Sequence, residues 1–182
     1  MQKFAVGVYK LRATVYESTA LYHHPAAPKS RQYRLRRPLE VCMDSRVKAA
    51  IVAAVKNEPF ARSFAIELIE LEDGRSVVEM TFDPRLSSNI YARAHGGAIY
   101  GLIDEAFETA GQTEGTIAVA LNVNVTYIAS PQEKTRLRAE ANRVSQTRKT
   151  AGYDIRVIDG EGQLIATCSA LAYRTGKPIP FL

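Results

Sequence analysis

Residues 92–111, with the sequence ARAHGGAIYGLIDEAFETAG, constrain the fold more than any other stretch of the chain. After the His-Gly-Gly near its start, the segment is apolar on most sides at helical spacing. A helix that is apolar nearly all round has to be surrounded by other elements, because its surface must be kept from water. The segment therefore predicts one long buried helix, and its Asp104 places a carboxylate where burial is expected.

The flanking segments predict the elements that surround this helix. Residues 44–57 carry Val47, Ile51 and Val55 at helical spacing, which predicts an amphipathic helix. Strand patterns follow in two groups. The first is residues 64–82, two strands that turn at Asp73-Gly74, and a loop at residues 83–94 comes after it. The second group lies after the long helix, at residues 116–128, 135–145, 151–159 and 163–174. One long helix within an antiparallel sheet predicts an α+β fold, in which a curved sheet wraps around the helix.

The strand at residues 116–128 shows a period of two in its sequence, TIAVALNVNVTYI. The odd positions from Ile117 to Tyr127 are apolar, and the even positions from Ala118 to Thr126 are small or polar. Strict alternation is typical of a strand with one buried face, since successive side chains point to opposite sides. We expect the odd positions to share one face.

The start of the long helix and its carboxylate form the candidate site. Gly97 begins the helix after His95-Gly96, where backbone N–H groups lack partners and carry a partial positive charge. Two glycines let an external group approach the backbone closely, which suits a carbonyl oxygen that becomes an oxyanion. Asp104 lies about two turns further on and shares a face with Gly101 and Glu108. It is a candidate general base or nucleophile.

Structural explanations compete with these functional ones. A lone histidine such as His95 is more often a hydrogen-bonded structural residue than a catalyst, and a buried aspartate such as Asp104 can equally be a structural hydrogen-bond acceptor. Glu105 and Glu108 are interpreted as solvated or interface charges, and Cys168 as a core residue. Three basic residues lie at the end of the second strand of the later group and in the turn after it: Arg143, Arg148 and Lys149. They are interpreted either as a solvated strand end and turn or as phosphate ligands of a long anionic substrate.

Charge divides the chain into two parts. Residues 1–42 carry eight basic and two acidic residues, a net charge of +6, whereas residues 43–182 have a net charge of −1. The stretch HHPAAPKSRQYRLRRP has little periodicity, so we expect residues 1–42 to be a basic, poorly ordered extension and residues 43–182 to be the main domain. The extension has three other interpretations: translation that begins at Met43, a tail for an acidic partner, and a DNA-binding domain. The last is weaker, because no helix-turn-helix pattern is visible, and a nearly neutral main domain predicts no nucleic-acid binding.

The composition limits the location of the protein. No apolar run approaches the roughly 20 residues of a membrane span, and no segment has the pattern of a secretory signal. The two cysteines, Cys42 and Cys168, lack metal-ligand spacing. We therefore expect a reduced, cytoplasmic protein that uses no metal or other cofactor.

Residues 44–182 resemble the hotdog-fold acyl-CoA thioesterases of the phenylacetate-degradation (PaaI-like) group. Asn89 stands six residues before His95, His95-Gly96-Gly97 opens the helix, and Asp104 stands nine residues after His95. The strand VALNVNVTYIASP follows, and the last strand ends in ALAYR. The order and spacing of these pieces carry the resemblance, since each piece alone is common.

The resemblance implies a fold and an assembly that periodicity does not show. In this family a curved antiparallel sheet wraps around one long central helix. Two subunits join their sheets edge to edge, dimers often pair into tetramers, and active sites lie at the dimer interface. By this resemblance Asp104 is the base or nucleophile, and the Gly97 N–H binds the thioester oxygen. Asn89 and His95 position the thioester or water, with Asn89 coming from the other subunit.

The sequence departs from the family pattern at two places. The family often has glycine three residues before the histidine, where this chain has Ala92, so the loop with Asn89 is open to a different path. A glycine also often precedes the basic residue between the later strands, where this chain has Thr147. That change weakens the assignment of Arg148 and Lys149 to nucleotide binding.

Hydrolysis of an acyl-CoA thioester, with an aryl or medium-chain acyl group, is the function that these features favour. The candidates for the acyl pocket are Tyr100, Phe107 and Asn122. A non-catalytic acyl-CoA sensor is the first alternative, because the basic extension is compatible with a regulator. A dehydratase or hydratase on the same fold is the second and weaker alternative, because the His-Gly-Gly and the following Asp104 stand in thioesterase order.

Overall fold

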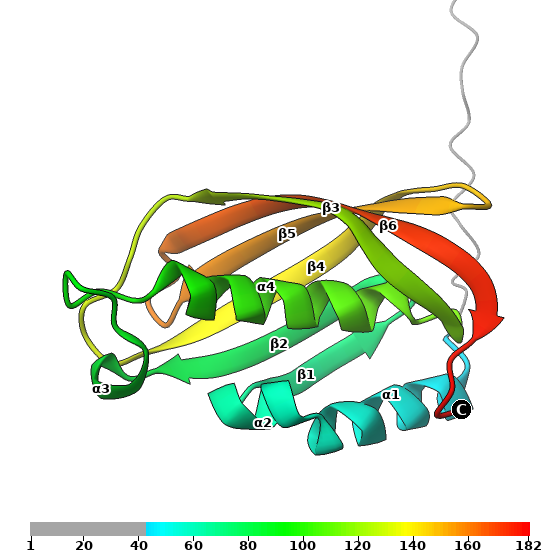
Figure 1. The fold of residues 1–182 in the computed structure, drawn as a ribbon, viewed down its shortest axis with the longest axis horizontal. Helices are drawn as coiled ribbons and strands as arrows, with labels where there is room; N and C mark the ends of the chain where they lie inside the picture. Colours follow the sequence, from blue (N-terminus) through cyan, green and yellow to red (C-terminus); the bar gives the residue numbers. More distant parts are fainter. Residues whose placement is uncertain (1–42) are drawn as a thin grey trace, which may run out of the picture. The chain divides into compact units, whose positions relative to one another are not determined.

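The computed structural model describes residues 43–182 (Figure 1). The expectations for residues 1–42, including Cys42, lie outside the described residues. Six strands form a single antiparallel sheet in the order β1-β2-β4-β5-β6-β3. Their bounds are β1 Glu67–Glu72, β2 Arg75–Phe82, β3 Thr116–Tyr127, β4 Thr135–Gln146, β5 Thr150–Asp159 and β6 Leu164–Pro178.

The long helix α4 (Gly96–Gly111) lies across the inner face of this curved sheet (Figure 1). It packs against all six strands, most extensively against β2 and β4. The apolar side chains that it turns to the sheet are at most 1% exposed: Ile99, Leu102, Ile103, Ala106 and Ala110. The predicted α+β fold, with a curved antiparallel sheet wrapped around one central helix, is therefore confirmed.

Helix α1 (Ser45–Asn57) forms as its pattern predicts. The Asp44 side chain caps it by accepting a hydrogen bond from the Arg46 N–H over 2.8 Å. Val47, Ile51 and Val55 are buried on one face. The helix packs near β1, so it covers the edge of the core that the sheet leaves open.

Two short helices were not expected from the sequence. Helix α2 (Pro59–Phe64) follows α1 directly, with a proline at its first position, where the missing N–H costs nothing. Helix α3 (Pro84–Ser87) begins after Asp83, whose carboxylate accepts a hydrogen bond from the Arg85 N–H over 2.9 Å. Phe60 of α2 lies so close to Gly101 of α4 that a Cβ on this glycine would stand 2.8 Å from the ring. Gly101 therefore makes room for α2.

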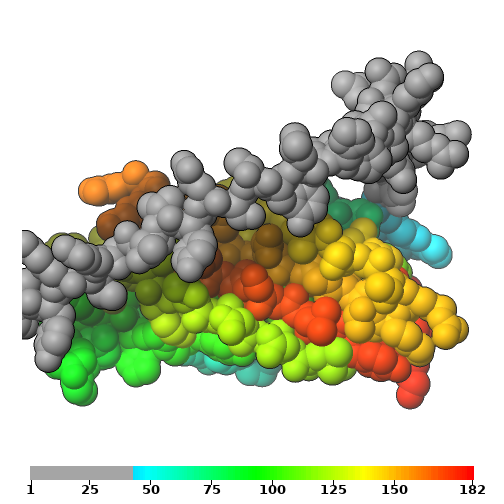
Figure 2. Space-filling view, turned by 90° about the horizontal axis from the view of Figure 1, so that it is seen from above, coloured from blue at the N-terminus to red at the C-terminus, as the bar shows by residue number. Residues whose placement is uncertain are grey.

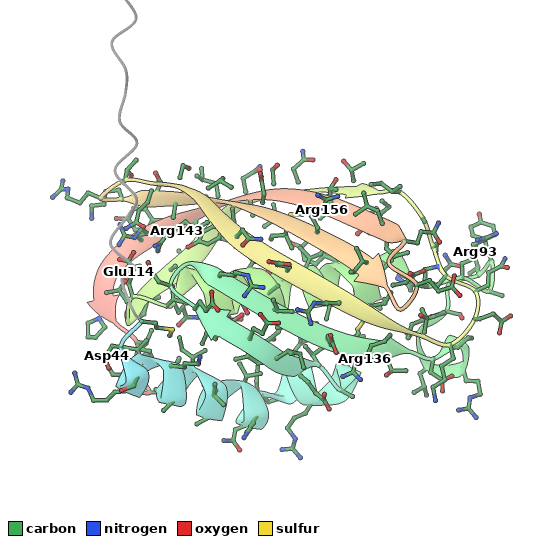
Figure 3. The ribbon with its side chains drawn as sticks, turned by 180° about the vertical axis from the view of Figure 1, so that it is seen from behind. Asp44, Arg93, Glu114, Arg136, Arg143 and Arg156 are labelled. Atoms are coloured by element: carbon green, nitrogen blue, oxygen red, sulfur yellow. The ribbon has the colours of Figure 1, made fainter. Side chains whose placement is uncertain are left out.

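Charged side chains cover the outer face of the sheet over β1, β2 and β4. Arg138 on β4 pairs with Glu79 and Glu70 over 2.9 and 2.7 Å, and Arg75 on β2 pairs with Glu70 and Glu140, each over 2.8 Å. Figure 3, which looks from behind the sheet, shows Arg136 next to this network. Toward β6 and β3 the outer face instead exposes apolar side chains, among them Leu171 and Tyr173.

Strand β3 is one edge of the sheet, and it contains a bulge at Leu121. Ala120 stands opposite Ala172 of β6, but Asn122 stands opposite Leu171, so Leu121 is an extra residue. Residues directly opposite each other share a face. The residues of β3 that share the inner face with buried β6 residues are therefore Ala120, Val123, Val125 and Tyr127.

This bulge corrects the predicted alternation of β3. The inner face takes even positions before Leu121 and odd positions after it, so the odd positions do not all share one face. The odd positions are apolar on both sides of the bulge, and those turned outward remain exposed: Val119 is 47% and Leu121 is 56% exposed. Figure 2 shows this strand in yellow-green beside the red β6, along one margin of the molecule.

Candidate active site

The start of α4 is capped by the histidine of the His-Gly-Gly motif. The Nδ1 atom of His95 accepts a hydrogen bond from the backbone N–H of Gly97 over 2.9 Å. An imidazole that accepts through Nδ1 is neutral and carries its hydrogen on Nε2. The exposed His95 side chain therefore presents an N–H donor, while the Gly97 N–H is already engaged by the cap.

The tyrosine at the end of β3 packs over the same helix start. The Tyr127 hydroxyl donates a hydrogen bond to the carbonyl oxygen of Gly96 over 3.1 Å. A Cβ added to Gly96 would lie 3.4 Å from the Tyr127 ring, so the glycine allows this close approach. The strand thus fixes the position of the helix N-terminus.

Asn89 lies in the loop just before the helix, and this loop is a closed, hydrogen-bonded turn. The Asn89 Oδ1 accepts from the backbone N–H groups of Tyr91 and Arg93 over 2.9 and 3.2 Å. The His95 N–H in turn donates to the carbonyl of Ser87 over 2.9 Å. These bonds hold Asn89, His95 and the helix start together as one unit.

Ala92, the residue that replaces the family's usual glycine, has a φ of +56°. This left-handed conformation disfavours residues that carry a Cβ and is easy for glycine. The backbone of this loop thus keeps a conformation suited to glycine although the side chain has changed. The Ala92 N–H donates to the Asn89 carbonyl over 3.0 Å, which supports the turn.

Asp104 lies two turns into α4 and is partly exposed. Its carboxylate lines a cavity of about 210 Å³ between the second half of α4 and strands β3 and β6. Loss of solvent raises the pKa of Asp104 above its usual 3.8, and among residues 43–182 no cation or hydrogen-bond donor offsets this shift. Such a carboxylate is a better proton acceptor than an ordinary exposed aspartate.

Two of the predicted acyl-pocket residues lie near Asp104. Phe107 is 4% exposed, lines the same cavity and packs edge-on against Tyr153, with ring centres 5.2 Å apart. Tyr100 is 38% exposed, and its pKa is raised by burial and then by the negative charge of Asp104. The remaining wall of the cavity is built from Glu108, Val119 and four small residues: Gly111, Ala118, Ala120 and Ala172.

The third predicted pocket residue, Asn122, lies elsewhere. It is exposed and stands opposite Leu171, on the outer face of the sheet. The cause is the bulge at Leu121, which reverses the alternation just before it. Within one chain Asn122 therefore does not line the cavity beside Asp104.

The basic residues of the turn between β4 and β5 lie far from the helix start. This turn is next to Glu114, just beyond the C-terminal end of α4, because Arg174 contacts both Glu114 and the Thr147 carbonyl. Arg148 is exposed, and the ammonium of Lys149 contacts the Tyr173 hydroxyl over 3.3 Å. Figure 1 shows that the turn and the helix N-terminus lie at opposite ends of the sheet.

Arg143 proves to be a structural residue. Its guanidinium pairs with Asp73 over 2.7 Å and with Glu114 over 2.8 Å, and the side chain is only 18% exposed. Figure 3 shows Arg143 and Glu114 at the end of the sheet where α1 begins, with Arg93 at the other end. The interpretation of Arg143 as a phosphate ligand is therefore not supported.

The interpretation of Glu105 as a solvated or interface charge is wrong. Glu105 is only 2% exposed, because α1 and the α1–α2 junction cover this side of α4. Glu108 is exposed, as expected. This difference between Glu105 and Glu108 leaves no signal in the sequence, since it depends on which elements pack against α4. Cys168 is buried and lies in the core, as expected.

Comparison with known proteins identifies the family. The thioesterase superfamily model matches residues 91–166, which contain the helix start, Asp104 and β3. A predicted esterase of Archaeoglobus fulgidus is 32% identical over 125 residues, which cover 69% of this chain and 80% of that protein. The chain therefore belongs to the thioesterase superfamily.

Two further relatives place the chain in the PaaI-like group. Acyl-coenzyme A thioesterase PaaI of Escherichia coli (strain K12) is 28% identical over 127 residues, covering 70% of this chain and 90% of that protein. The structure of the E. coli PaaI protein matches with a TM-score of 0.71 at 26% identity, over 75% of this chain and 99% of that one. The structure of a Streptococcus mutans protein bound to acetyl CoA matches with a TM-score of 0.59 at 26% identity, over 63% and 91%.

The described part of the chain contains no helix that is both long enough and apolar enough to cross a membrane. The most apolar helix, α4, has 16 residues and carries three carboxylates: Asp104, Glu105 and Glu108.

Proposed function

We propose that this protein hydrolyses acyl-CoA thioesters with an aryl or medium-chain acyl group, and that Asp104 is the base or nucleophile. The observation that carries the proposal is the desolvated Asp104 carboxylate, which lines a small, mostly apolar cavity. The relationship to acyl-coenzyme A thioesterase PaaI and to the acetyl-CoA-bound structure supports the substrate class. The small residues of the cavity wall leave room for an acyl chain.

The start of α4 supplies the chemistry for the carbonyl oxygen. The helix N-terminus carries partial positive charge, and donors placed there stabilise the oxyanion that forms when the thioester is attacked. Two N–H groups are candidates: the Gly97 N–H, once the substrate replaces the cap, and the Nε2–H that the cap leaves on His95. Asn89, held in the adjoining turn, positions the thioester or water.

The spacing along α4 favours a site shared by two subunits. Gly97 and Asp104 are seven residues apart, about 10 Å along the helix axis. Each has to come within about 3 Å of the same thioester group. Two antiparallel subunits joined through their β3 edges relieve this problem, because Asn89, His95 and Gly97 of one chain then face Asp104 of the partner.

The free edge of β3 supports this assembly. The strand forms one end of the sheet, and apolar side chains on and just after it are about half exposed: Val119, Leu121, Tyr127 and Ile128. An exposed apolar edge strand is a ready template for pairing with a second chain. In such a dimer the turn with Arg148 and Lys149 comes to the same end as the partner's helix start, within reach of the CoA phosphates. We further propose a homodimer that pairs into a homotetramer in the cytoplasm.

The first experiment is release of free thiol from a panel of aryl and C4 to C16 acyl-CoAs by the purified full chain. We expect hydrolysis of at least one member, with the highest kcat/KM for an aryl or medium-chain group. Tight binding of acyl-CoAs without any thiol release contradicts hydrolysis and favours the sensor. Hydration of an enoyl-CoA instead favours the hydratase.

A mixing experiment tests the shared site. Asp104→Asn and His95→Ala chains each have strongly reduced activity when alone, but a mixed dimer holds one site with all wild-type residues. Random assembly of equal amounts restores about a quarter of the wild-type activity. No recovery in verified mixed dimers contradicts the sharing of residues between subunits, while leaving the hydrolysis itself to the thiol assay.

A further inference from the structure

Three carboxylates meet on the side of α4 that is covered by α1 and α2. They are Glu105 and Glu108 of α4 and Glu58, the single residue between α1 and α2. One carboxylate oxygen from each lies within 4.8 Å of the other two. They line a cavity of about 340 Å³ with Ile51, Asn57 and Phe181. Of the three, only Glu108 also lines the cavity of Asp104, whereas Glu58 and Glu105 do not.

The cluster lacks compensating positive charge. None of the ion pairs among residues 43–182 includes Glu58, Glu105 or Glu108. Within the described part of the chain, the neutral Gln112 amide is the only side-chain donor that reaches the cluster, and it donates to Glu108 over 3.3 Å. Like charges this close repel one another, and the repulsion strengthens where water is excluded.

Glu105 adds a second and independent observation. Its side chain is only 2% exposed, and its Oε1 atom has no hydrogen-bond partner among the described residues. A buried carboxylate oxygen without a donor is costly, and native structures rarely leave one unsatisfied. This oxygen points to a ligand that the protein atoms themselves do not provide.

We propose that Glu58, Glu105 and Glu108 bind a hard divalent cation of the size of Ca²⁺, which joins the α1–α2 junction to the central helix. The cluster consists of oxygen donors only, with no histidine or cysteine, which suits Ca²⁺, Mg²⁺ or Mn²⁺ and disfavours zinc and copper. The three oxygens all lie within 4.8 Å of one another, and two oxygens bound to one Ca²⁺ at about 2.4 Å are at most about 4.8 Å apart, so a single ion can contact all three.

The surroundings suit a hydrated ion. Three carboxylates fill only part of the six to eight positions around Ca²⁺. The cavity has room for water, and Glu108 is exposed at its mouth, so water completes the shell and the ion has a path from solvent. A bound ion supplies the charge that the cluster lacks and a partner for the Glu105 Oε1. Its expected role is structural, since two of its three ligands, Glu58 and Glu105, lie outside the cavity of Asp104.

The test is calorimetric titration of the full chain, stripped with EDTA, with CaCl₂, MgCl₂ and MnCl₂ at pH 8, together with thermal unfolding in each salt. We expect one Ca²⁺ per chain and a higher Tm in Ca²⁺ than in EDTA. Glu105→Gln and Glu108→Gln weaken binding about tenfold or more. Glu161→Gln, at an exposed turn glutamate outside the cluster, retains it.

Two outcomes overturn the proposal. The first is no heat and no Tm shift with any of the three salts up to about 10 mM, well above the weakest protein Ca²⁺ sites. The cluster then holds a shared proton instead of an ion. The second is binding that both Glu105→Gln and Glu108→Gln leave unchanged, which places the ion elsewhere. Because Glu108 is exposed, its variant keeps the test valid if Glu105→Gln folds poorly.

Discussion

The Nδ1 atom of His95 accepts a hydrogen bond from the backbone N–H of Gly97, its second neighbour along the chain, over 2.9 Å. This one bond pairs an N–H group at the helix N-terminus and sets the tautomer of the imidazole. It also occupies the Gly97 N–H, which is proposed to bind the thioester oxygen. Substrate binding has to exchange this cap for a bond to the carbonyl, or use the Nε2–H beside it. The roles of histidine as cap and as donor can be separated by mutation.

His95→Ala and His95→Asn separate these two roles. Alanine removes the cap and lowers the free energy of unfolding by about 1 kcal/mol, whereas asparagine is a good N-cap and keeps it. Both variants lose the Nε2–H, so we expect kcat/KM to fall about tenfold or more in each. Chemical denaturation and the thiol assay measure the two effects. Full activity in His95→Asn shows that the histidine acts only as a cap.

Asp104→Asn removes the proposed base without changing the shape of the cavity. We expect kcat/KM to fall about 100-fold or more, while the Tm stays level or rises, because a desolvated charge has been removed. Asp154→Asn on the exposed side of β5 is the matched control and retains activity. Activity within about threefold of wild type in folded Asp104→Asn rules the aspartate out as base or nucleophile.

The pH dependence of hydrolysis reports on the same carboxylate. Asp104 acts only when it is deprotonated, and burial raises its pKa above 3.8. The rate kcat/KM therefore increases as pH rises through this raised pKa, and activity is lost on the acid side at a higher pH than for an ordinary aspartate. A pH–rate profile measures the midpoint. A rate that stays constant down to pH 4 contradicts the assignment.

Glu105→Gln should change how stability depends on pH. Burial and then the charges of Glu58, Glu108 and Asp104 raise the pKa of Glu105 from 4.5 to about 8 in the folded state. Between these values the folded chain holds a proton that the unfolded chain has released, so stability decreases as pH rises from 4.5 to about 8. In EDTA we expect Glu105→Gln to gain in Tm relative to wild type across this window. If the Tm values of wild type and Glu105→Gln change in parallel with pH, the raised pKa of Glu105 is contradicted.

Ala92→Gly should stabilise the loop before the central helix. Ala92 has a φ of +56°, which glycine adopts without strain, so we expect a gain of about 0.5 kcal/mol or more in the free energy of unfolding. The same change at Ala53, exposed in the middle of α1, should cost about 1 kcal/mol. Chemical denaturation compares the two. A loss at both positions means that the turn does not strain Ala92.

The sequence predicts the long elements of this fold because their patterns repeat over many residues. Helix α4 and the later strands each show several periods of apolar residues, and the chain follows them. The short helices α2 and α3 have too few residues for a period, and their prolines resemble turns. The bulge could not be predicted because the odd and the even positions of β3 both carry residues that tolerate burial.

The candidate site was predictable only in part. The His-Gly-Gly motif and Asp104 stand on one helix, so their relationship follows from local geometry. The burial of Glu105 depends on α1 and α2, and the commitment of Arg143 to Asp73 and Glu114 depends on contacts between distant segments. Such tertiary contacts leave no periodic signal in a single sequence.

The bulge at Leu121 decides how much space Asp104 faces. In a strand of the same sequence without the bulge, Leu121 would stand opposite Ala172, because Asn122 stands opposite Leu171. The leucine side chain would then face α4 in place of Ala120 and occupy the space that alanine leaves open. The register of one edge strand, with every side chain unchanged, is thus a route by which such a fold can narrow its range of substrates.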